Sequence, residues 1–243
     1  MLTGVSLFAG IGGFDLAMER NGVKVVATVE IDKSCNKVLA RHFPNATQFS
    51  DIKEVTGKDL TNAGFDPNNG IITGGFPCQD LSVAGRRAGL AGERSGLFWE
   101  IRRLVEETES KWFILENVPG LLSSNGGKDF GIVLGEMAQL GYSIGWRVLD
   151  AQYFGVPQRR RRVFIVGCRS GNARSIQQVL FEREGVSRNT EASRETGQGT
   201  TSTSARGFGQ TGFAKYSEGV TTLTATMHKR PEDNIVVSDS DEG

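Results

Sequence analysis

Cysteine is scarce in this sequence of 243 residues, which contains three. Cys35, Cys78 and Cys168 are odd in number, far apart and without neighbouring histidines. This spacing excludes a disulfide scaffold and gives no set of zinc ligands, so we expect no metal site. Cys35 and Cys168 fall in an expected helix and beside an apolar run, where buried structural thiols are the simplest interpretation.

Long hydrophobic runs are also missing, and neither sign of charge is in excess. No apolar run is long enough to cross a bilayer, and residues 1–13 do not form a basic and then apolar leader. We therefore expect a soluble, cytoplasmic protein without a membrane partner. Lys plus Arg (28) equals Asp plus Glu (28), but arginines cluster locally at residues 86–87, 102–103 and 159–162. Local basic patches are therefore expected.

Short apolar runs alternate with segments of helical periodicity over the first half of the chain. Strands are predicted at residues 5–8, 25–29, 71–73 and 112–115, and helices at 14–20, 33–42 and 97–108. This alternation predicts an α/β fold whose strands are mostly parallel and covered by helices on both faces.

The pattern changes in the second half. Residues 142–149 and 162–167 are separated by a loop too short for a crossover helix, which predicts an antiparallel strand pair. Residues 193–222 are rich in Gly, Ser and Thr, a composition typical of linkers and loops. A brief strand pattern returns at residues 220–226 and 234–237.

A glycine loop follows the first predicted strand. Its sequence, AGIGG at residues 9–13, leads into a helix, so a ligand could approach the backbone at the helix N-terminus. Glu30 ends the second strand about twenty residues later, where an acid can accept hydrogen bonds from ribose hydroxyls. Asp51 ends a third apolar segment. Taken separately, the glycine loop could be an ordinary tight turn, and each acid could be a helix cap, a role for which Asp32 is another candidate. Taken together, the loop and the two acids favour an adenosine-containing cofactor.

Two further segments are predicted to meet at the same sheet edge. GGFPCQ places Cys78 just beyond a central strand, where active sites of parallel sheets lie. The next strand delivers Glu116 in ENVP. A carboxylate would not help a neighbouring thiol to ionise, so we expect Glu116 to be protonated and to donate to a ring nitrogen while Cys78 attacks the ring.

An arginine run, QRRRR at residues 158–162, precedes another strand. Side chains alternate along a strand, so Arg160 and Arg162 are expected on one face and Arg159 and Arg161 on the other. Opposite Cys78 and Glu116, one pair would stabilise a thiolate and position a base or phosphate. A solvated basic turn is the alternative.

Together these motifs resemble, in order and spacing, the first eight motifs of cytosine-5 DNA methyltransferases. They are SLFAGIGGFD, VEID, SDI, GGFPCQDLSVAG, ENVPGLL and QRRRRVFIVG. The resemblance implies a Rossmann-like S-adenosylmethionine-dependent methyltransferase fold acting on double-stranded DNA. It implies methyl transfer to carbon 5 of a flipped-out cytosine through a covalent Cys78 adduct, with residues 79–96 as the mobile loop that closes over the base. The implied catalytic residues are Cys78, Glu116, Arg160 and Arg162, and the implied cofactor-binding residues are Phe8, Gly10, Ile11, Gly12, Gly13, Glu30, Ile31, Asp51, Ile52, Pro77 and Leu97.

The resemblance also divides the chain and leaves alternatives open. Residues 1–169 would form the catalytic and cofactor-binding domain, and residues 170–243 a linker with a partial target-recognition region. Because the family's last two motifs are not found after Gly171, we expect either a second polypeptide that supplies them or an inactive, truncated remnant. A nicotinamide-dependent dehydrogenase would share the glycine loop but gives Cys78 and Glu116 no role. An RNA cytosine methyltransferase would share the cofactor pocket, but the PCQ and ENV pair matches the DNA-acting pattern.

Overall fold

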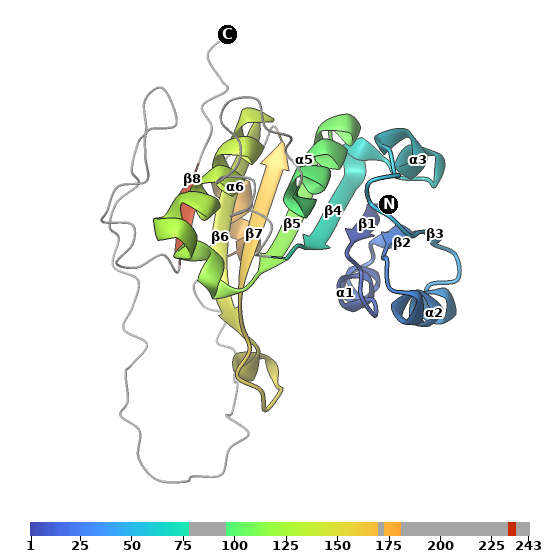
Figure 1. Ribbon diagram of the computed structural model, residues 1–243, viewed down its shortest axis with the longest axis horizontal. Helices are drawn as coiled ribbons and strands as arrows, with labels where there is room; N and C mark the ends of the chain where they lie inside the picture. The colour runs from blue at the N-terminus through green and yellow to red at the C-terminus, as the bar shows by residue number, and fades with distance from the viewer. Residues whose placement is uncertain (78–95, 170–172, 181–232, 237–243) are drawn as a thin grey trace.

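The computed structural model describes residues 1–77, 96–169, 173–180 and 233–236, which build one eight-stranded sheet (Figure 1). The strand order is β3-β2-β1-β4-β5-β7-β6-β8. Strands β1 to β5 pair in parallel, whereas β7 is antiparallel to both β5 and β6, and β8 is antiparallel to β6. The predicted α/β fold with a terminal antiparallel pair is confirmed. The strands are β1 Thr3–Leu7, β2 Lys24–Val29, β3 Thr47–Phe49, β4 Gly70–Gly75, β5 Trp112–Asn117, β6 Tyr142–Asp150, β7 Arg161–Arg169 and β8 Asp233–Val236.

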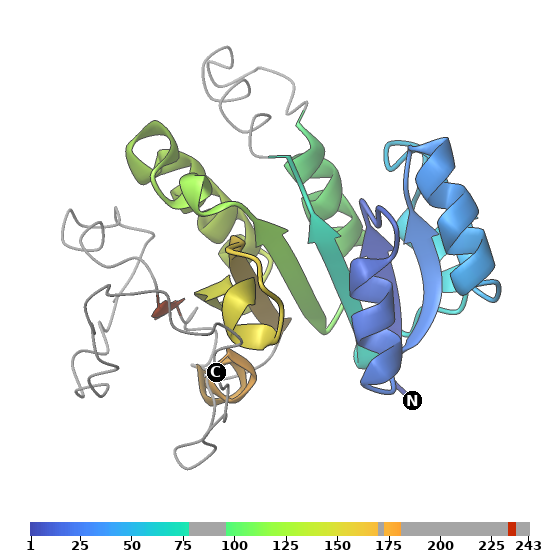
Figure 2. The ribbon, with the colours of Figure 1, turned by 90° about the horizontal axis from the view of Figure 1, so that it is seen from below.

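Helices cover both faces of this sheet. Helices α5 and α6 lie on one face, and α1 and α7 lie on the other (Figures 1 and 2). Strands enclosed in this way read as nearly continuous apolar runs, and every residue from Val25 to Val29 is buried. The helices are α1 Gly13–Arg20, α2 Lys33–His42, α3 Gly57–Asn62, α5 Leu97–Thr108, α6 Lys128–Gln139 and α7 Ala173–Leu180, with 3-10 turns η1 Pro67–Asn69, η2 Pro119–Leu122, η3 Ser124–Gly127 and η4 Ala151–Phe154.

The sheet reverses its direction of growth between β1 and β4, because β1 pairs with β2 on one side and with β4 on the other. At such a switch point the loops leaving the two strands diverge to opposite faces, which opens a crevice at the carboxyl ends. The glycine loop follows β1, and the GGFP segment ends β4. Both therefore lie at this crevice.

Local sequence explains where α2 and α5 form. The side chain of Asp32 accepts hydrogen bonds from the backbone N–H groups of Ser34 and Cys35 at 2.7 and 2.8 Å, so it caps α2 as expected. Helix α5 buries Phe98, Ile101 and Leu104 at helical spacing. Both helices have the bounds predicted from the sequence. Cys168 is buried as expected, but Cys35 is only half-buried, because α2 is a surface helix that buries Leu39 alone.

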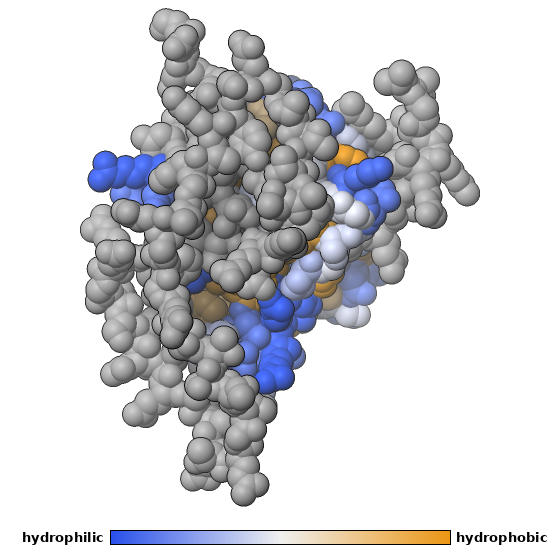
Figure 3. Space-filling model, turned by 90° about the vertical axis from the view of Figure 1, so that its left-hand side faces the viewer, coloured by the Kyte–Doolittle hydropathy of each residue, from blue (hydrophilic) through white to orange (hydrophobic). Residues whose placement is uncertain are grey.

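The strand predicted near residues 234–237 is confirmed as β8, which extends the sheet beyond β6, whereas the strand pattern at residues 220–226 lies outside the described residues. Helix α7 packs against β6 and β7 through Ile176, which is fully buried. Strand β8 and helix α7 therefore pack with the elements that precede residue 169. The division of the chain into domains at residues 169 and 170 stays a prediction. Figure 3 views this side of the molecule, whose described surface mixes hydrophilic and hydrophobic residues. None of the described helices is long and apolar enough to cross a membrane.

Candidate active site

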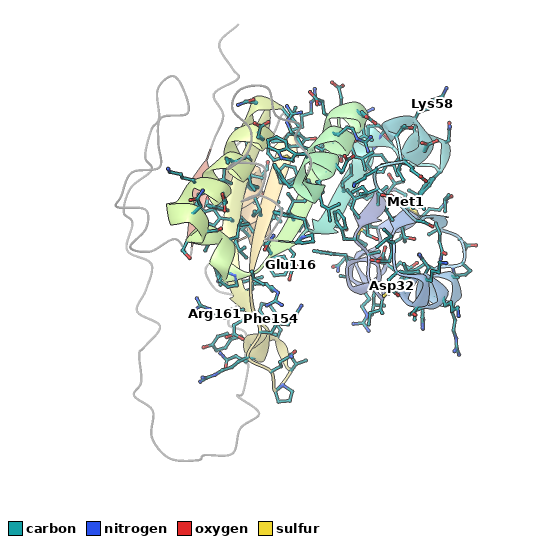
Figure 4. All side chains as sticks on the ribbon, in the orientation of Figure 1. Met1, Asp32, Lys58, Glu116, Phe154 and Arg161 are labelled. Atoms are coloured by element: carbon teal, nitrogen blue, oxygen red, sulfur yellow. The ribbon has the colours of Figure 1, made fainter. Side chains whose placement is uncertain are left out.

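The segments singled out in the sequence meet at the carboxyl edge of the sheet. In the strand register, Leu7 lies opposite Val29 and Gly74, and Gly75 lies opposite Glu116. Figure 4 shows Asp32 and Glu116 at this same edge. Asp32 follows β2, and Glu116 lies near the end of β5. The predicted convergence of the glycine loop, the GGFP segment and the ENVP segment is therefore confirmed at the level of the strands.

The glycine loop adopts a backbone that other residues rarely accept. Gly10 and Gly12 have φ angles of 56° and 92°, and Phe8 has a φ of 56° despite its side chain. A Cβ atom on Gly12 would lie 2.5 Å from the ring of Phe43, whereas a Cβ on Gly10 or Gly13 would meet no atom of the described residues within 4 Å. The loop therefore packs on α2 at Gly12 and faces open space at Gly10 and Gly13.

Glu30 ties this loop to the start of α2. One carboxylate oxygen accepts a hydrogen bond from the backbone N–H of Gly10 at 2.7 Å, and the other accepts from the N–H of Asp32 at 2.8 Å. The amide of Asn36 donates to the backbone carbonyl of Glu30 at 2.7 Å. Glu30 thus lies in contact with the glycine loop, and it has a structural role that the sequence did not reveal.

Ile11, in the middle of the glycine loop, and Ile31, next to Glu30, are exposed apolar side chains. They are 70% and 72% exposed. Pro77 is also exposed, and Leu97 is partly buried against the core at the first position of α5.

The step after β3 is more enclosed. Ile52 is 4% exposed, and its side chain belongs to the core. Asp51 is half-buried, and its carboxylate accepts a hydrogen bond from the backbone N–H of Lys53 at 3.0 Å. Asp51 therefore forms a local turn, which was the alternative interpretation for this acid. A second carboxylate oxygen leaves room for a ligand contact as well.

A buried acid links α1 to β1 next to the glycine loop in sequence. Asp15, in the first turn of α1, is fully buried and accepts a hydrogen bond from the hydroxyl of Ser6 at 2.5 Å. Its other carboxylate oxygen has no hydrogen-bond partner among the described residues. Burial raises the pKa of Asp15 above its ordinary value. This residue was not singled out in the sequence, because nothing local distinguishes it from an exposed helix acid.

Glu116 and Arg162 form the polar centre of the edge. The Nε atom of Arg162 donates to Glu116 Oε1 at 2.7 Å, with 23% and 22% of the two side chains exposed. A Cβ atom on Gly75 would lie 3.0 Å from Glu116 Oε2, so a glycine there gives the carboxylate room. The predicted meeting of Glu116 with an arginine of the run is thus observed for Arg162, and the role of the pair in catalysis stays a proposal.

Asn117 joins the two most distinctive motifs. Its side chain is 3% exposed, and its Nδ2 atom donates to the backbone carbonyl of Phe76 at 2.8 Å. Its Oδ1 atom accepts from the backbone N–H of Val118, also at 2.8 Å. The sequence assigns Asn117 no role beyond its place in the ENVP motif. The sequence does contain one indication of its role, because strand alternation predicts a buried side chain at this position and the residue there carries a polar amide.

The remaining residues of the predicted site are less enclosed or not described. Arg160 is exposed and precedes β7, where its backbone N–H donates to the carboxylate of Asp150 at 3.2 Å. Its expected alignment with Arg162 stays a prediction. Cys78 and the expected mobile loop at residues 79–96 lie outside the described residues, except for Gly96. Figure 4 shows Phe154, the last residue of η4, and Arg161, the first residue of β7, below Glu116.

The class of protein follows from this geometry and from the solved structures that share it. The sheet is that of the Rossmann-like S-adenosylmethionine-dependent methyltransferases. The structure of a prophage-encoded Escherichia coli protein, described as a DNA modification methyltransferase, matches with a TM-score of 0.58 and 27% identity over 70% of this chain and 47% of that one. Among the described residues, no group of three acidic, His or Cys side chains could hold a metal ion.

The family is defined more narrowly by sequence. The family model of the C-5 cytosine-specific DNA methylases matches residues 2–232, and the chain belongs to this family. The Type II methyltransferase M.BsuFI of Bacillus subtilis is 38% identical over 166 residues, which are 68% of this chain and 39% of the relative. M1.ScrFI of Lactococcus lactis subsp. cremoris is 32% identical over 247 residues, covering 93% of this chain and 61% of the relative. The chain thus spans only part of the length of these relatives.

Proposed function

We propose that this chain carries the catalytic centre and the cofactor site of a DNA cytosine-5 methyltransferase. It would transfer a methyl group from S-adenosylmethionine to carbon 5 of a cytosine flipped out of double-stranded DNA. Its relatives are named as Type II methyltransferases, and we propose the corresponding role in a restriction-modification context.

The observation that carries the proposal is the junction between the PCQ and ENV motifs. Asn117 holds the carbonyl of Phe76, which is two residues before Cys78, and the neighbouring Glu116 lies against Gly75 and Arg162. One buried amide thus fixes the ends of two adjacent strands, from which we expect the thiol of Cys78 and the carboxyl group of Glu116 to reach one site. A dehydrogenase would need no such junction.

In the proposed reaction the Cys78 thiolate forms a bond to ring carbon 6 of cytosine. Glu116 donates a proton to ring nitrogen 3, so the ring electrons accumulate at carbon 5 and not at the nitrogen. Arg162 holds the Glu116 carboxyl group in place and leaves Oε2 for the base. S-adenosylmethionine, when bound, supplies an electrophilic methyl group. Water then accepts the proton on carbon 5, the bond from ring carbon 6 to Cys78 breaks to release the thiolate, and the N3 proton returns to Glu116, which frees the methylated base.

The glycine loop fits the cofactor. Open space at Gly10 and Gly13 lets the backbone approach a ligand, and exposed Ile11 and Ile31 offer apolar cover for it. Glu30 would bind the ribose hydroxyls and Asp51 the adenosine on the β3 side, since carboxylates are strong hydrogen-bond acceptors. The other proposed contacts are Phe8, Gly12, Ile52, Pro77 and Leu97.

The experiment that tests the function is covalent trapping with duplex DNA containing 5-fluorocytosine. Fluorine cannot leave as a proton, so the bond from Cys78 to the ring should persist after methyl transfer and yield a denaturant-resistant adduct. Cys78→Ser should form no adduct, because an alcohol does not supply a thiolate. Cys35→Ser, which changes a half-buried thiol on α2, is the matched control and should trap normally. A Cys78→Ser variant that methylates at the wild-type rate would overturn the proposal.

The part of the relatives that this chain does not span bears on whether it acts alone. The matched segment is 39% of the length of M.BsuFI. The choice of DNA target and the complete methylation activity are therefore proposed for the protein as a whole and not for this segment alone. An inactive or partner-dependent subunit is the competing hypothesis. Trapping should therefore be repeated with a separately expressed fragment that carries the family's last two motifs. Adduct formation only with that fragment would favour partner dependence, and equal trapping without it would contradict it.

A further inference from the structure

Two adjacent arginines on α5 bind different parts of the molecule. Arg102 donates to Glu136 of α6 at 2.8 Å and to Glu106 on its own helix at 2.6 Å. Arg103 points the other way. Its Nη2 atom donates to the backbone carbonyl of Ile52 at 2.9 Å. Arg102 thus joins helix to helix, whereas Arg103 joins α5 to the segment that follows β3.

Acidic residues on α5 fix the guanidinium of Arg103. Glu100 accepts from Nε at 2.8 Å, and Glu107 accepts from Nη1 at 2.9 Å. All three nitrogens of the fork therefore have a partner, and only 31% of the Arg103 side chain is exposed. A lysine could not replace this arrangement, because one ammonium group does not span three separate directions.

Glu107 extends the contact to the start of α3. Its second carboxylate oxygen accepts from the backbone N–H of Gly57 at 2.6 Å. A Cβ atom on Gly57 would lie 2.7 Å from the Cβ of Glu107, so the two backbones approach closely. The segment from residue 52 to residue 57 is therefore bound to α5 at both ends, by Arg103 and by Glu107.

We propose that Arg103 is a positioning residue for the cofactor. By holding the carbonyl of Ile52, it fixes the backbone on which Asp51 presents its carboxylate toward the adenosine part of S-adenosylmethionine. This inference rests on the proposed function. A fixed carbonyl matters here because Asp51 follows a strand of only three residues, β3, which by itself gives the turn little support.

The test is calorimetric binding of S-adenosylhomocysteine to the full chain, with Arg102→Met as the matched control. Arg103→Met should weaken binding roughly tenfold, equivalent to about 1.4 kcal/mol, whereas Arg102→Met should leave it within about twofold. Arg103→Lys should recover only part of the loss. Thermal melting of each variant shows how much folded protein is present, and Arg103→Lys keeps the test available if Arg103→Met folds poorly.

A double variant distinguishes positioning from a general loss of structure. If Arg103 acts through Asp51, then Arg103→Met should cost little further affinity in an Asp51→Ala background. Additive losses in the double variant, or equal binding by Arg103→Met and Arg102→Met, would overturn the positioning role while the wild-type chain still binds. A wild-type chain that does not bind S-adenosylhomocysteine would overturn the proposed cofactor site, and this inference with it.

Discussion

The buried amide of Asn117 offers the sharpest test of how the two motifs are joined. In Asn117→Ala the carbonyl of Phe76 loses its side-chain donor in a buried position, which costs about 1–3 kcal/mol. The backbone N–H of Val118 also loses its acceptor, but Val118 is 40% exposed and water can replace part of that bond. The two losses together should lower the free energy of unfolding by about 2–4 kcal/mol.

The measurement is urea denaturation followed by circular dichroism, combined with the trapping rate on 5-fluorocytosine DNA. Asn21→Ala is the matched control, because Asn21 also donates from Nδ2 to a backbone carbonyl, at 2.9 Å, but in an exposed position. Its cost should stay within about 0.5 kcal/mol. Asn117→Asp keeps the acceptor for Val118 and loses the donor to Phe76, so it should retain most of the defect. Equal stability of Asn117→Ala and Asn21→Ala, with equal trapping, would refute the reasoning.

Three further predictions concern the cofactor edge. Glu30→Ala should weaken binding of S-adenosylhomocysteine by at least roughly tenfold, because bonds to a charged acceptor contribute about 1.5–3 kcal/mol each; unchanged calorimetric affinity would leave Glu30 with its structural role alone. Gly12→Ala should lower the free energy of unfolding by about 1–3 kcal/mol, because Gly12 has a φ of 92° and a Cβ there would clash with Phe43. Gly13→Ala should instead weaken cofactor binding with little loss of stability. The reverse pattern in urea denaturation and calorimetric binding would contradict this assignment. Asp15→Asn should stabilise the protein at pH 7, because a carboxyl group whose pKa is raised by folding destabilises the folded state when the pH lies above 3.8, its pKa in the unfolded chain. This gain in stability should vanish as the pH falls through the folded-state pKa toward 3.8. A gain that is independent of pH in urea denaturation would contradict the prediction.

The sequence predicted the order of elements well where periodicity was strong. Helices α2 and α5 begin and end where their caps and apolar spacing indicate, and the antiparallel pairing of β6 with β7 follows from the short loop between them. Strand β3 was indicated only as a third apolar segment that Asp51 ends, and helix α3 was not predicted, because three and six residues are too few to establish a period. Helix α7 was also missed, since residues 170–243 were assigned to a linker with a partial target-recognition region, and the burial of α7 depends on packing against β6 and β7.

Sequence alone placed Glu116, Glu30 and the glycine loop at one edge, because parallel strands bring their carboxyl ends together whatever the side chains between them. It also assigned the family, through motifs whose order does not depend on the conformation. Only the tertiary structure decided which arginine meets Glu116, that Glu30 holds the loop, and that Asn117 and Arg103 fix backbone carbonyls of distant segments. Those contacts join residues 20 to 51 positions apart, so their geometry depends on how helices and strands pack and not on any local pattern.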